Sequence, residues 1–418
     1  MREVLFDISR LLVRGSRFTP TGIDRVVLAY ARWLLAEPEV SLQPVATVGG
    51  RILACPRDLL ARIAEGAEGF SAAARASPAT DRAWAQLVEA LGEAPGRAPP
   101  SRAGSLARQL APRALWHVSV LGRDGWRLRP ARLRPDAVYL NVSHTGLDHS
   151  QVLGRVAAAG AAPVVMVHDL IPITHPEYCS PSAEARHERR ITHVLRHARL
   201  VITNSATTAD TLASYAATRG EASPPAVVAP LGLEADFLSP PAALAGARPY
   251  FVALGTLEAR KNLAMLLALW RRLAERMGEA APSLVLVGRR GWENEAVIDH
   301  LERSKAALRF VHEIADLQDA QVASLIAGAR ALLAPSFAEG YDLPVIEALS
   351  VGTPVIASDI PVHRELARAA QLIDPLDGPA WLAAIEAARL NPTRPSPSPG
   401  PRWSDHFASV RDAVLAAR

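Results

Sequence analysis

Two carboxylates, Glu339 and Glu347, lie in the stretch 336–347, which reads SFAEGYDLPVIE. The apolar run before it, 331–334, predicts a buried strand. Pro344 stands where a first helical residue is expected, because proline has no N–H to lose at that position. Glu339 therefore falls in a strand-to-helix loop and Glu347 in the first helical turns. We expect both carboxylates to face one crevice, together with the backbone N–H groups of the loop.

The helix predicted here begins at Asp342 or Leu343 and ends before Gly352. A helix N-terminus attracts anions, most often phosphate. Two carboxylates beside a phosphate would repel it, unless they accept hydrogen bonds from hydroxyl groups on either side. A nucleotide-sugar has that arrangement, because ribose and hexose flank its diphosphate. The simpler alternative is a helix cap beside a solvated glutamate, which is a common arrangement.

A pair of cations, Arg260 and Lys261, is predicted at or just before another helix start, after the buried strand 250–254 and Gly255. Positive charge is unfavourable there, because that end of a helix dipole is itself positive. A bound anion would remove the penalty, since arginine offers a fork of donors and lysine a point charge. Lysine occurs only at 261 and 305 in this arginine-rich chain, which hints at a specific use for the ammonium. We interpret the pair as a diphosphate clamp.

Polar residues also follow predicted strands in the N-terminal half. The loop 14–22 joins the strand 4–8 to an amphipathic helix, 23–35, and brings Gly22 and Arg25 to the start of that helix. A glycine in such a loop lets the backbone approach a ligand. No GxGxxG fingerprint is present, and a plain strand-to-helix connection is the alternative.

His144, His168 and Asp169 follow the strands predicted at 137–142 and 162–167. The carboxyl ends of parallel strands meet at one edge of a sheet, so we expect a polar crevice there. A histidine at this edge can exchange a proton near neutral pH or bind a phosphate or sugar hydroxyl. It can equally anchor a loop to a neighbouring carbonyl. No Glu or Cys ligand stands at a spacing that would make these histidines, with His175, a zinc site.

Buried apolar strands alternate with helices along the whole chain, which predicts parallel sheets. One series spans 1–240 and a second spans 241–400. A last helix, in 401–418, is expected to pack back on the first domain. The interval 55–115 fits neither series and is interpreted as a variable insertion.

Within that insertion, 57–92 is helical in pattern, and 93–112 predicts a surface loop rich in Pro, Gly and Arg. The loop is either solvated or in contact with anionic lipid. In the C-terminal series, a short strand is predicted at 308–311, with Glu313 and Ile314 at its end.

Composition narrows the class of protein. The chain has 418 residues and a net charge of +4, and its basic residues are not clustered as in a nucleic-acid binder. Its two cysteines, Cys55 and Cys179, predict neither a disulfide framework nor a cysteine metal site. No run approaches the roughly 20 apolar residues that span a bilayer, and no signal peptide is recognised. The expectation is a cytoplasmic protein, with contact at the inner face of the membrane as an alternative.

Three motifs together resemble the retaining GT-B glycosyltransferases of family 4. They are Arg260-Lys261-Asn262, Pro335-Ser-x-x-Glu339-Gly-x-x-Leu-Pro-x-x-Glu347-Ala, and Gly352-x-Pro-Val-Ile-Ala-Ser-Asp359. The likeness covers most of 200–375. Thr21-Gly-Ile-Asp-Arg25, His168-Asp169 and Asn204-Ser205 are similar in a looser way. The resemblance implies an α/β protein of the GT-B fold, with two Rossmann-like domains facing across a cleft.

The resemblance also implies a role for each site residue. Glu339 accepts hydrogen bonds from the donor sugar, Glu347 holds the ribose, and Arg260 with Lys261 neutralises the diphosphate. His168 contacts the sugar or the transition state. The other implied contacts are Asp169 beside His168, the loop around Gly22 at the reaction centre, Glu313 and Ile314 at the base, and the backbone of Gly340, Tyr341, Asp342 and Leu343 beside the sugar.

The implied reaction moves a hexose to a glycan or lipid-linked glycan with retention at the anomeric carbon. The resemblance favours GDP-mannose as donor, while UDP-sugars and deoxysugar donors stay open. No Asp-x-Asp triplet occurs, so neither a metal nor a cofactor is expected. The rival hypotheses are a nucleotide-sugar epimerase of the same fold and a non-catalytic nucleotide-sugar-binding module. A phosphorylase would need a pyridoxal lysine, and Lys261 is already assigned to the clamp.

Overall fold

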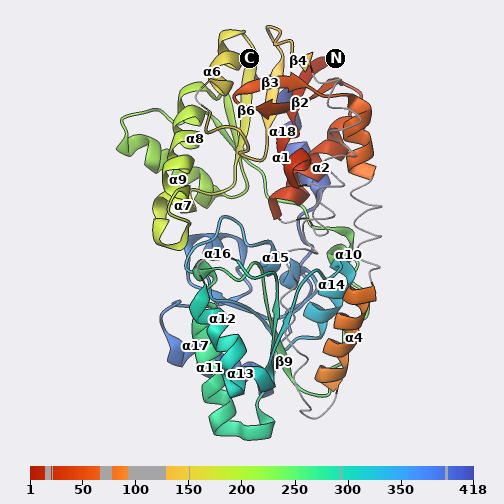
Figure 1. The fold of residues 1–418 in the computed structure, drawn as a ribbon, viewed down its shortest axis with the longest axis vertical. Helices are drawn as coiled ribbons and strands as arrows, with labels where there is room; N and C mark the ends of the chain where they lie inside the picture. The colour runs from red at the N-terminus through yellow and green to blue at the C-terminus, as the bar shows by residue number, and fades with distance from the viewer. Residues whose placement is uncertain are drawn as a thin grey trace. The chain divides into compact units, whose positions relative to one another are not determined.

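The computed structural model describes residues 1–14, 20, 22–65, 78–92, 129–149, 151–291, 294–390 and 394–418. The loop predicted at 93–112 and most of the loop 14–22 lie outside the described residues. Two compact units make up the chain, coloured by residue number in Figure 1. The first comprises Met1–Ala74, Ala103–Gly232 and Arg402–Arg418, and the second comprises Arg75–Arg102 and Leu233–Pro401.

The first unit is built on an eight-stranded sheet of order β4-β3-β2-β1-β5-β6-β7-β8. Near one edge β3 pairs antiparallel with both β2 and β4, and the other neighbouring strands of the sheet pair parallel. The central strands read as continuous apolar runs because both faces of a parallel sheet are covered, and every residue of β6 is buried. The strands are β1 (Arg2–Asp7), β2 (Val40–Val48), β3 (Arg51–Ala54), β4 (Arg129–Pro130), β5 (Val138–Asn141), β6 (Ala162–Val167), β7 (Leu200–Thr203) and β8 (Ala226–Val228).

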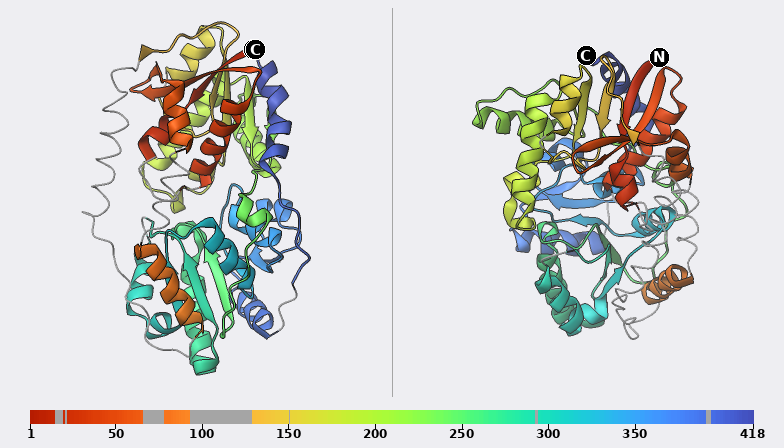
Figure 2. Two further views of the ribbon diagram at one scale, coloured as in Figure 1. Left: turned by 90° about the vertical axis from the view of Figure 1, so that its right-hand side faces the viewer. Right: turned by 45° about the horizontal axis from the view of Figure 1, so that its top comes forward.

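The C-terminal helix α18 (Trp403–Ala416) packs on the first unit, as predicted (Figure 2). The Tyr30 hydroxyl of α2 lies 2.8 Å from Nε2 of His406. Trp33 stacks on Phe407 with the ring centroids 4.7 Å apart. The helices of this unit with defined bounds are α1 (Ser9–Arg14), α2 (Gly22–Ala36), α6 (Val152–Ala158), α7 (Ile171–Thr174), α8 (Ala183–His197), α9 (Ala206–Thr218) and α18.

The second unit is built on a six-stranded parallel sheet of order β11-β10-β9-β12-β13-β14. Sequence-consecutive strands run outward from β9 in one direction and from β12 in the other. The order therefore reverses between β9 and β12, and this is the place where open α/β sheets bind ligands. The strands are β9 (Tyr250–Leu254), β10 (Ser283–Val287), β11 (Val311–Ile314), β12 (Leu332–Ala334), β13 (Val355–Ser358) and β14 (Gln371–Ile373).

Helices cover both faces of this second sheet, with α11, α12 and α13 on one side and α14 on the other (Figure 1). On the α11 side, Trp270 and Trp381 are fully buried, and the Trp270 indole N–H donates to the carbonyl of Pro282. The helices are α4 (Pro78–Gly92), α10 (Ala235–Leu238), α11 (Leu263–Met277), α12 (Glu295–Arg303), α13 (Lys305–Phe310), α14 (Asp319–Gly328), α15 (Leu343–Ser350), α16 (Pro361–Leu366) and α17 (Gly378–Leu390).

The prediction of a strand at 308–311 was wrong, because residues 308–310 belong to helix α13 and only Val311 belongs to β11. The hydroxyl of Ser304 caps α13 by accepting the N–H of Ala307. Ala307 and Phe310 are buried three residues apart, which is a helical spacing, and Leu308 and Arg309 between them are exposed. The helical pattern at 57–92 is observed at 57–65 and 78–92, and the residues between lie outside the described ranges.

Candidate functional site

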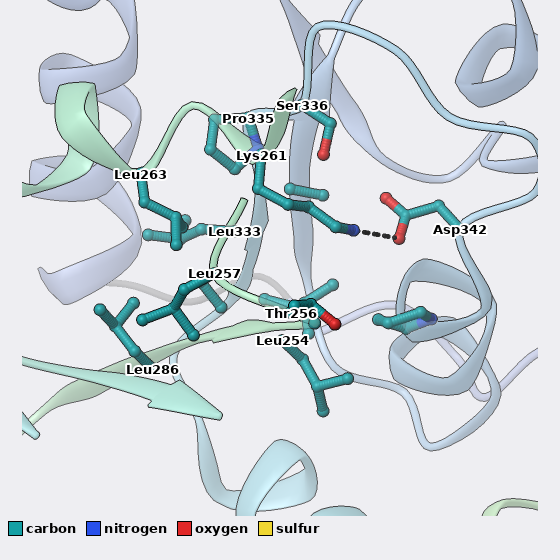
Figure 3. A pocket seen from close by; sticks show the side chains of 15 residues that line it. Leu254, Thr256, Leu257, Lys261, Leu263, Leu286, Leu333, Pro335, Ser336 and Asp342 are labelled. Carbon is teal, nitrogen blue, oxygen red and sulfur yellow. Dashed lines mark hydrogen bonds and ion pairs between the residues drawn. The ribbon is translucent and has the colours of Figure 1, made fainter. Parts of the chain in front are cut away.

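A pocket lies beyond the carboxyl ends of β9 and β12, at the reversal of strand order in the second unit (Figure 3). Residues that follow the two strands line it, among them Gly255 and Ser336, and Asp342 closes one side at the start of α15. Lys261 reaches into the pocket from a single 3₁₀ turn, η3 (Ala259–Lys261), that links β9 to α11.

The ammonium of Lys261 is held between two carboxylates. Nζ lies 2.7 Å from Oε1 of Glu339 and 3.2 Å from Oδ1 of Asp342. Burial by itself lowers the pKa of Lys261, but the nearby charges of Asp342 and Glu339 outweigh it and raise that pKa. Lys261 is therefore a fixed positive charge in a site where the residue is only 8% exposed.

Arg260 contacts the other oxygen of Glu339. Its NH1 atom lies 2.6 Å from Oε2 of Glu339, and its Nε lies 3.2 Å from Oε2 of Glu258. Burial raises the pKa of Glu339, but the charges of Arg260 and Lys261 together prevail and lower it. Glu339 is thus an ionised carboxylate that joins the two cations of the predicted clamp.

The carboxylates of the protein already compensate the two cations near the helix start. The sequence favoured a bound anion as the group that removes the penalty for this position of Arg260 and Lys261. In the structure Glu258, Glu339 and Asp342 offset the two charges already. The cations are consequently preorganised by the protein, and an arriving diphosphate has to share them with these carboxylates.

Gly255 makes room for the lysine. Its φ of +134° is a conformation that side-chain-bearing residues rarely adopt, and a Cβ built there would lie 2.9 Å from Cε of Lys261. The residue is therefore glycine for two independent reasons, backbone conformation and the close approach of the lysine stem.

Helix α15 begins at Leu343, as predicted, with Asp342 as its N-terminal flanking residue. Asp342 has a left-handed φ of 60°, and its carboxylate makes no cap hydrogen bond to the helix. Oδ1 faces Lys261, and Oδ2 lies 3.1 Å from Nε2 of His363 in α16. Burial raises the pKa of Asp342, but Lys261 and then His363 outweigh it, so this pKa is lowered.

His363 was missed by the sequence reasoning, as was the side-chain role of Asp342. His363 is 1% exposed, and its Nδ1 lies 2.8 Å from the carbonyl oxygen of Ser358 at the end of β13. The available signal was a histidine in the first turn of a helix that follows a buried strand. For Asp342 the signal was an aspartate directly before a predicted helix, a residue type that tolerates a left-handed backbone.

The remaining predicted residues of the second unit lie in and just before helix α15 and on strand β11. Glu347 is in the second turn of α15 and is 3% exposed, and Gly340 and Tyr341 precede that helix. Glu313 lies within β11, two strands from β9, where Arg290 binds its carboxylate through Nε and NH2, each at 2.8 Å. Ile314 ends the same strand.

In the first unit the structure brings His144 and His168 together, with ring centroids 5.3 Å apart. Nε2 of His168 lies 2.8 Å from the carbonyl oxygen of Val142, so this nitrogen carries the proton and Nδ1 is left as an acceptor. Nε2 of His168 therefore anchors a loop to a neighbouring carbonyl, which was the alternative to a functional role, and Nδ1 takes no part in that contact. Burial is the main cause that lowers the pKa of both imidazoles.

A third histidine, His187 of α8, completes this cluster and was not predicted. Its ring centroid lies 5.5 Å from that of His144, and its Nε2 lies 3.1 Å from the carbonyl oxygen of Asp169. Gly22 and Arg25 lie in the first turn of α2 in the same unit. The predicted site residues therefore form one set in the first unit and one in the second.

The described residues contain no group of three or more His, Cys, Asp or Glu side chains arranged to hold a metal ion. None of the helices among them combines the length and apolar character needed to cross a membrane.

Comparison with known sequences gives matches in the second unit and beyond. Residues 248–389 match the family described as glycosyl transferases group 1. The serotype-specific mannosyltransferase WbdA of Escherichia coli is 30% identical over 231 residues, which are 52% of this chain and 28% of WbdA. The O-antigen chain mannosyltransferase B of Escherichia coli is 31% identical over 236 residues, 53% of this chain and 60% of that protein. The matches thus span less than two thirds of either relative.

Solved structures share the fold at low sequence identity. Sucrose-phosphate synthase from Thermosynechococcus elongatus has a TM-score of 0.56 at 16% identity, with 100% of this chain and 95% of that chain covered. Anabaena HepE, solved in complex with UDP, has a TM-score of 0.56 at 14% identity with the same coverage. The chain has the GT-B fold.

Proposed function

From the premise that residues 248–389 are a glycosyltransferase group 1 domain, we propose that the protein transfers a hexose from a nucleotide-diphospho-sugar to a glycan or lipid-linked glycan. GDP-mannose is the favoured donor and mannose the transferred sugar, because the curated relatives are mannosyltransferases. The observation that carries the proposal is the ion-paired cluster of Arg260, Lys261 and Glu339 at the reversal of strand order, where α/β sheets bind ligands.

Charge builds on the diphosphate as the glycosidic bond breaks, and the two cations stabilise it. Lys261 is fixed by its carboxylate partners before the donor arrives, so little reorganisation accompanies the reaction. A preorganised donor of this kind typically lowers a barrier by roughly 3 kcal/mol. In this proposal the transfer needs neither a metal nor a cofactor.

The carboxylates recognise hydroxyl groups on either side of that diphosphate. Glu339 is ionised and acceptor-only, so it binds sugar hydroxyls while it keeps Arg260 and Lys261 in place. Glu347 holds the ribose hydroxyls, and the backbone N–H groups of 340–343 serve the sugar from the start of α15. Together these groups orient the anomeric carbon.

The family resemblance assigns roles to the predicted residues of the first unit as well. His168 presents an unprotonated Nδ1, which accepts a hydrogen bond from a sugar hydroxyl, and Asp169 and His144 lie beside it at the carboxyl edge of the sheet. Gly22 and Arg25 bind the acceptor. Retention follows a front-face route: the acceptor oxygen bonds to the anomeric carbon as the diphosphate leaves, and the acceptor proton passes to a diphosphate oxygen.

Incubation with a panel of nucleotide-sugars, in the presence of EDTA and short mannose oligosaccharides, tests this proposal. We expect acceptor-dependent release of nucleotide, fastest from GDP-mannose, and loss of that release in Glu339→Gln. Absence of both turnover and binding for every donor would contradict the transferase assignment. An epimerised donor without nucleotide release would favour the epimerase, and donor binding without turnover would favour a binding module.

A further inference from the structure

We propose that His363 is a buried imidazolium that positions Asp342 and, through it, Lys261. The inference concerns the site of the proposed glycosyltransferase and rests on that function for its kinetic consequence. It starts from the two partners of the ring, the carbonyl oxygen of Ser358 at 2.8 Å from Nδ1 and Oδ2 of Asp342 at 3.1 Å from Nε2.

Both partners can only accept hydrogen bonds. A backbone carbonyl has no proton to donate, so Nδ1 of His363 must carry one. Asp342 is ionised because Lys261 lies 3.2 Å from its other oxygen, so Nε2 must carry a proton as well. A ring that donates from both nitrogens is the imidazolium.

The surroundings favour the charged ring. Burial lowers the pKa of His363, but the hydrogen bond and the charge of Asp342, then the Ser358 carbonyl and Glu339, prevail and raise it. The ring therefore faces carboxylates from the start of α15 and from the loop before it, with Lys261 on the far side of Asp342. On its own helix, the neighbouring Arg364 pairs with Asp359.

The proton on His363 completes an alternating series of charges. Glu339, Lys261, Asp342 and His363 follow one another as anion, cation, anion and cation. If His363 lost that proton, Lys261 would be the one remaining cation in contact with Asp342 among the described residues. One uncompensated negative charge would then lie beside the pocket proposed for a diphosphate. It would also release one of the two groups that hold Asp342 in its left-handed conformation.

The protonation state is measured directly by NMR of the full chain with ¹⁵N-labelled histidine, assigned with His363→Gln. We expect both ring nitrogens of His363 to be protonated at pH 7.5. His406 is the internal control: it is also 1% exposed with both nitrogens hydrogen-bonded, but its Tyr30 partner can donate, so it is neutral. A neutral His363 would overturn the inference, whether or not the protein turns over.

The same spectra of Asp342→Asn provide a matched variant. Asparagine tolerates the left-handed backbone and its amide can donate to Nε2, so His363 should become neutral without loss of the fold. If His363→Gln does not fold, the resonance that changes in Asp342→Asn gives the assignment. An imidazolium that persists in Asp342→Asn would contradict the role given to Asp342.

Kinetics test the positioning role. His363→Gln and Asp342→Asn should each lower kcat/KM for the donor by about 10- to 100-fold, the scale expected when a reacting group is displaced by about 1 Å. The double variant should be no worse than the more severe single variant, because both act through one contact. Fully additive losses would overturn the inference. The control His406→Gln, checked for folding, should keep the wild-type kcat/KM. A wild-type protein without activity would refute the proposed function but not the charged state of His363.

Discussion

Replacement of Lys261 by methionine separates the structural from the chemical role of the ammonium. Methionine keeps an unbranched apolar side chain beside Gly255 and has no ammonium group. Breaking a buried ion pair usually costs about 3–5 kcal/mol, because it leaves an uncompensated charge. Here both partners keep a second cation, since Arg260 lies 2.6 Å from Glu339 and His363 lies 3.1 Å from Asp342.

The expected loss of stability is therefore smaller than usual, about 2 kcal/mol, which for a domain of roughly 150–250 residues lowers Tm by about 4–8 °C. The expected loss of activity is larger. Without Lys261 the leaving diphosphate loses one preorganised cation, worth roughly 3 kcal/mol, so kcat should fall by a factor of about 100 or more.

The assay compares nucleotide release and thermal unfolding of Lys261→Met with those of Lys305→Met. Lys305 is the other lysine of the chain and is exposed at the start of α13, so its replacement should change neither quantity. Lys261→Met with wild-type kcat would refute the assignment of Lys261 to the leaving group. A fall in kcat accompanied by loss of the folded state at the assay temperature would refute the argument that Glu339 and Asp342 keep second partners.

Three further outcomes are expected. Gly255→Ala should lower the free energy of unfolding by about 1–3 kcal/mol and raise KM for the donor, because it strains the backbone and displaces Lys261. The control is Gly220→Ala: Gly220 also has a positive φ, but the space around its Cβ position is open, so KM should stay unchanged. Glu339→Gln should lower kcat/KM by about 100-fold or more in donor kinetics, because the amide no longer binds the cations as an anion. The ion pairs predict that Tm passes through a maximum as pH is varied. The pKa of Glu339 is lowered by folding, so its contribution to stability is present above the unfolded pKa of 4.5 and is lost as pH falls through the folded pKa. The pKa of His363 is raised by folding, so its contribution is present below the unfolded pKa of 6.5 and is lost as pH rises through the folded pKa. His363→Gln should flatten only the alkaline decline, and an unchanged alkaline limb would contradict the charged state of that ring.

Local features of the sequence were sufficient for many elements. The strands 162–167 and 250–254 have the predicted bounds, because a continuous apolar run is complete within each segment. The start of α15 was also predicted, since Pro344 and the preceding turn determine it locally. The error at 308–311 arose because a segment of four residues is too short to distinguish the period of a strand from that of a helical turn.

The charge pairs of the site could not be predicted in the same way. Arg260 follows β9 and Glu339 follows β12, and they meet only because these two strands are neighbours at the reversal of strand order. The sequence showed two cations near a helix start but not the carboxylates that offset them. The contact of Asp342 with His363 likewise joins two helices across the carboxyl ends of β12 and β13.

A crystal structure of the full chain with GDP bound is the most direct test of the central claim, that the cluster of Arg260, Lys261 and Glu339 binds the nucleotide diphosphate of the donor. We expect diphosphate oxygens within hydrogen-bonding distance of Arg260 and Lys261, and ribose hydroxyls at Glu347. A nucleotide bound elsewhere, with Lys261 still held only by Glu339 and Asp342, would contradict the claim.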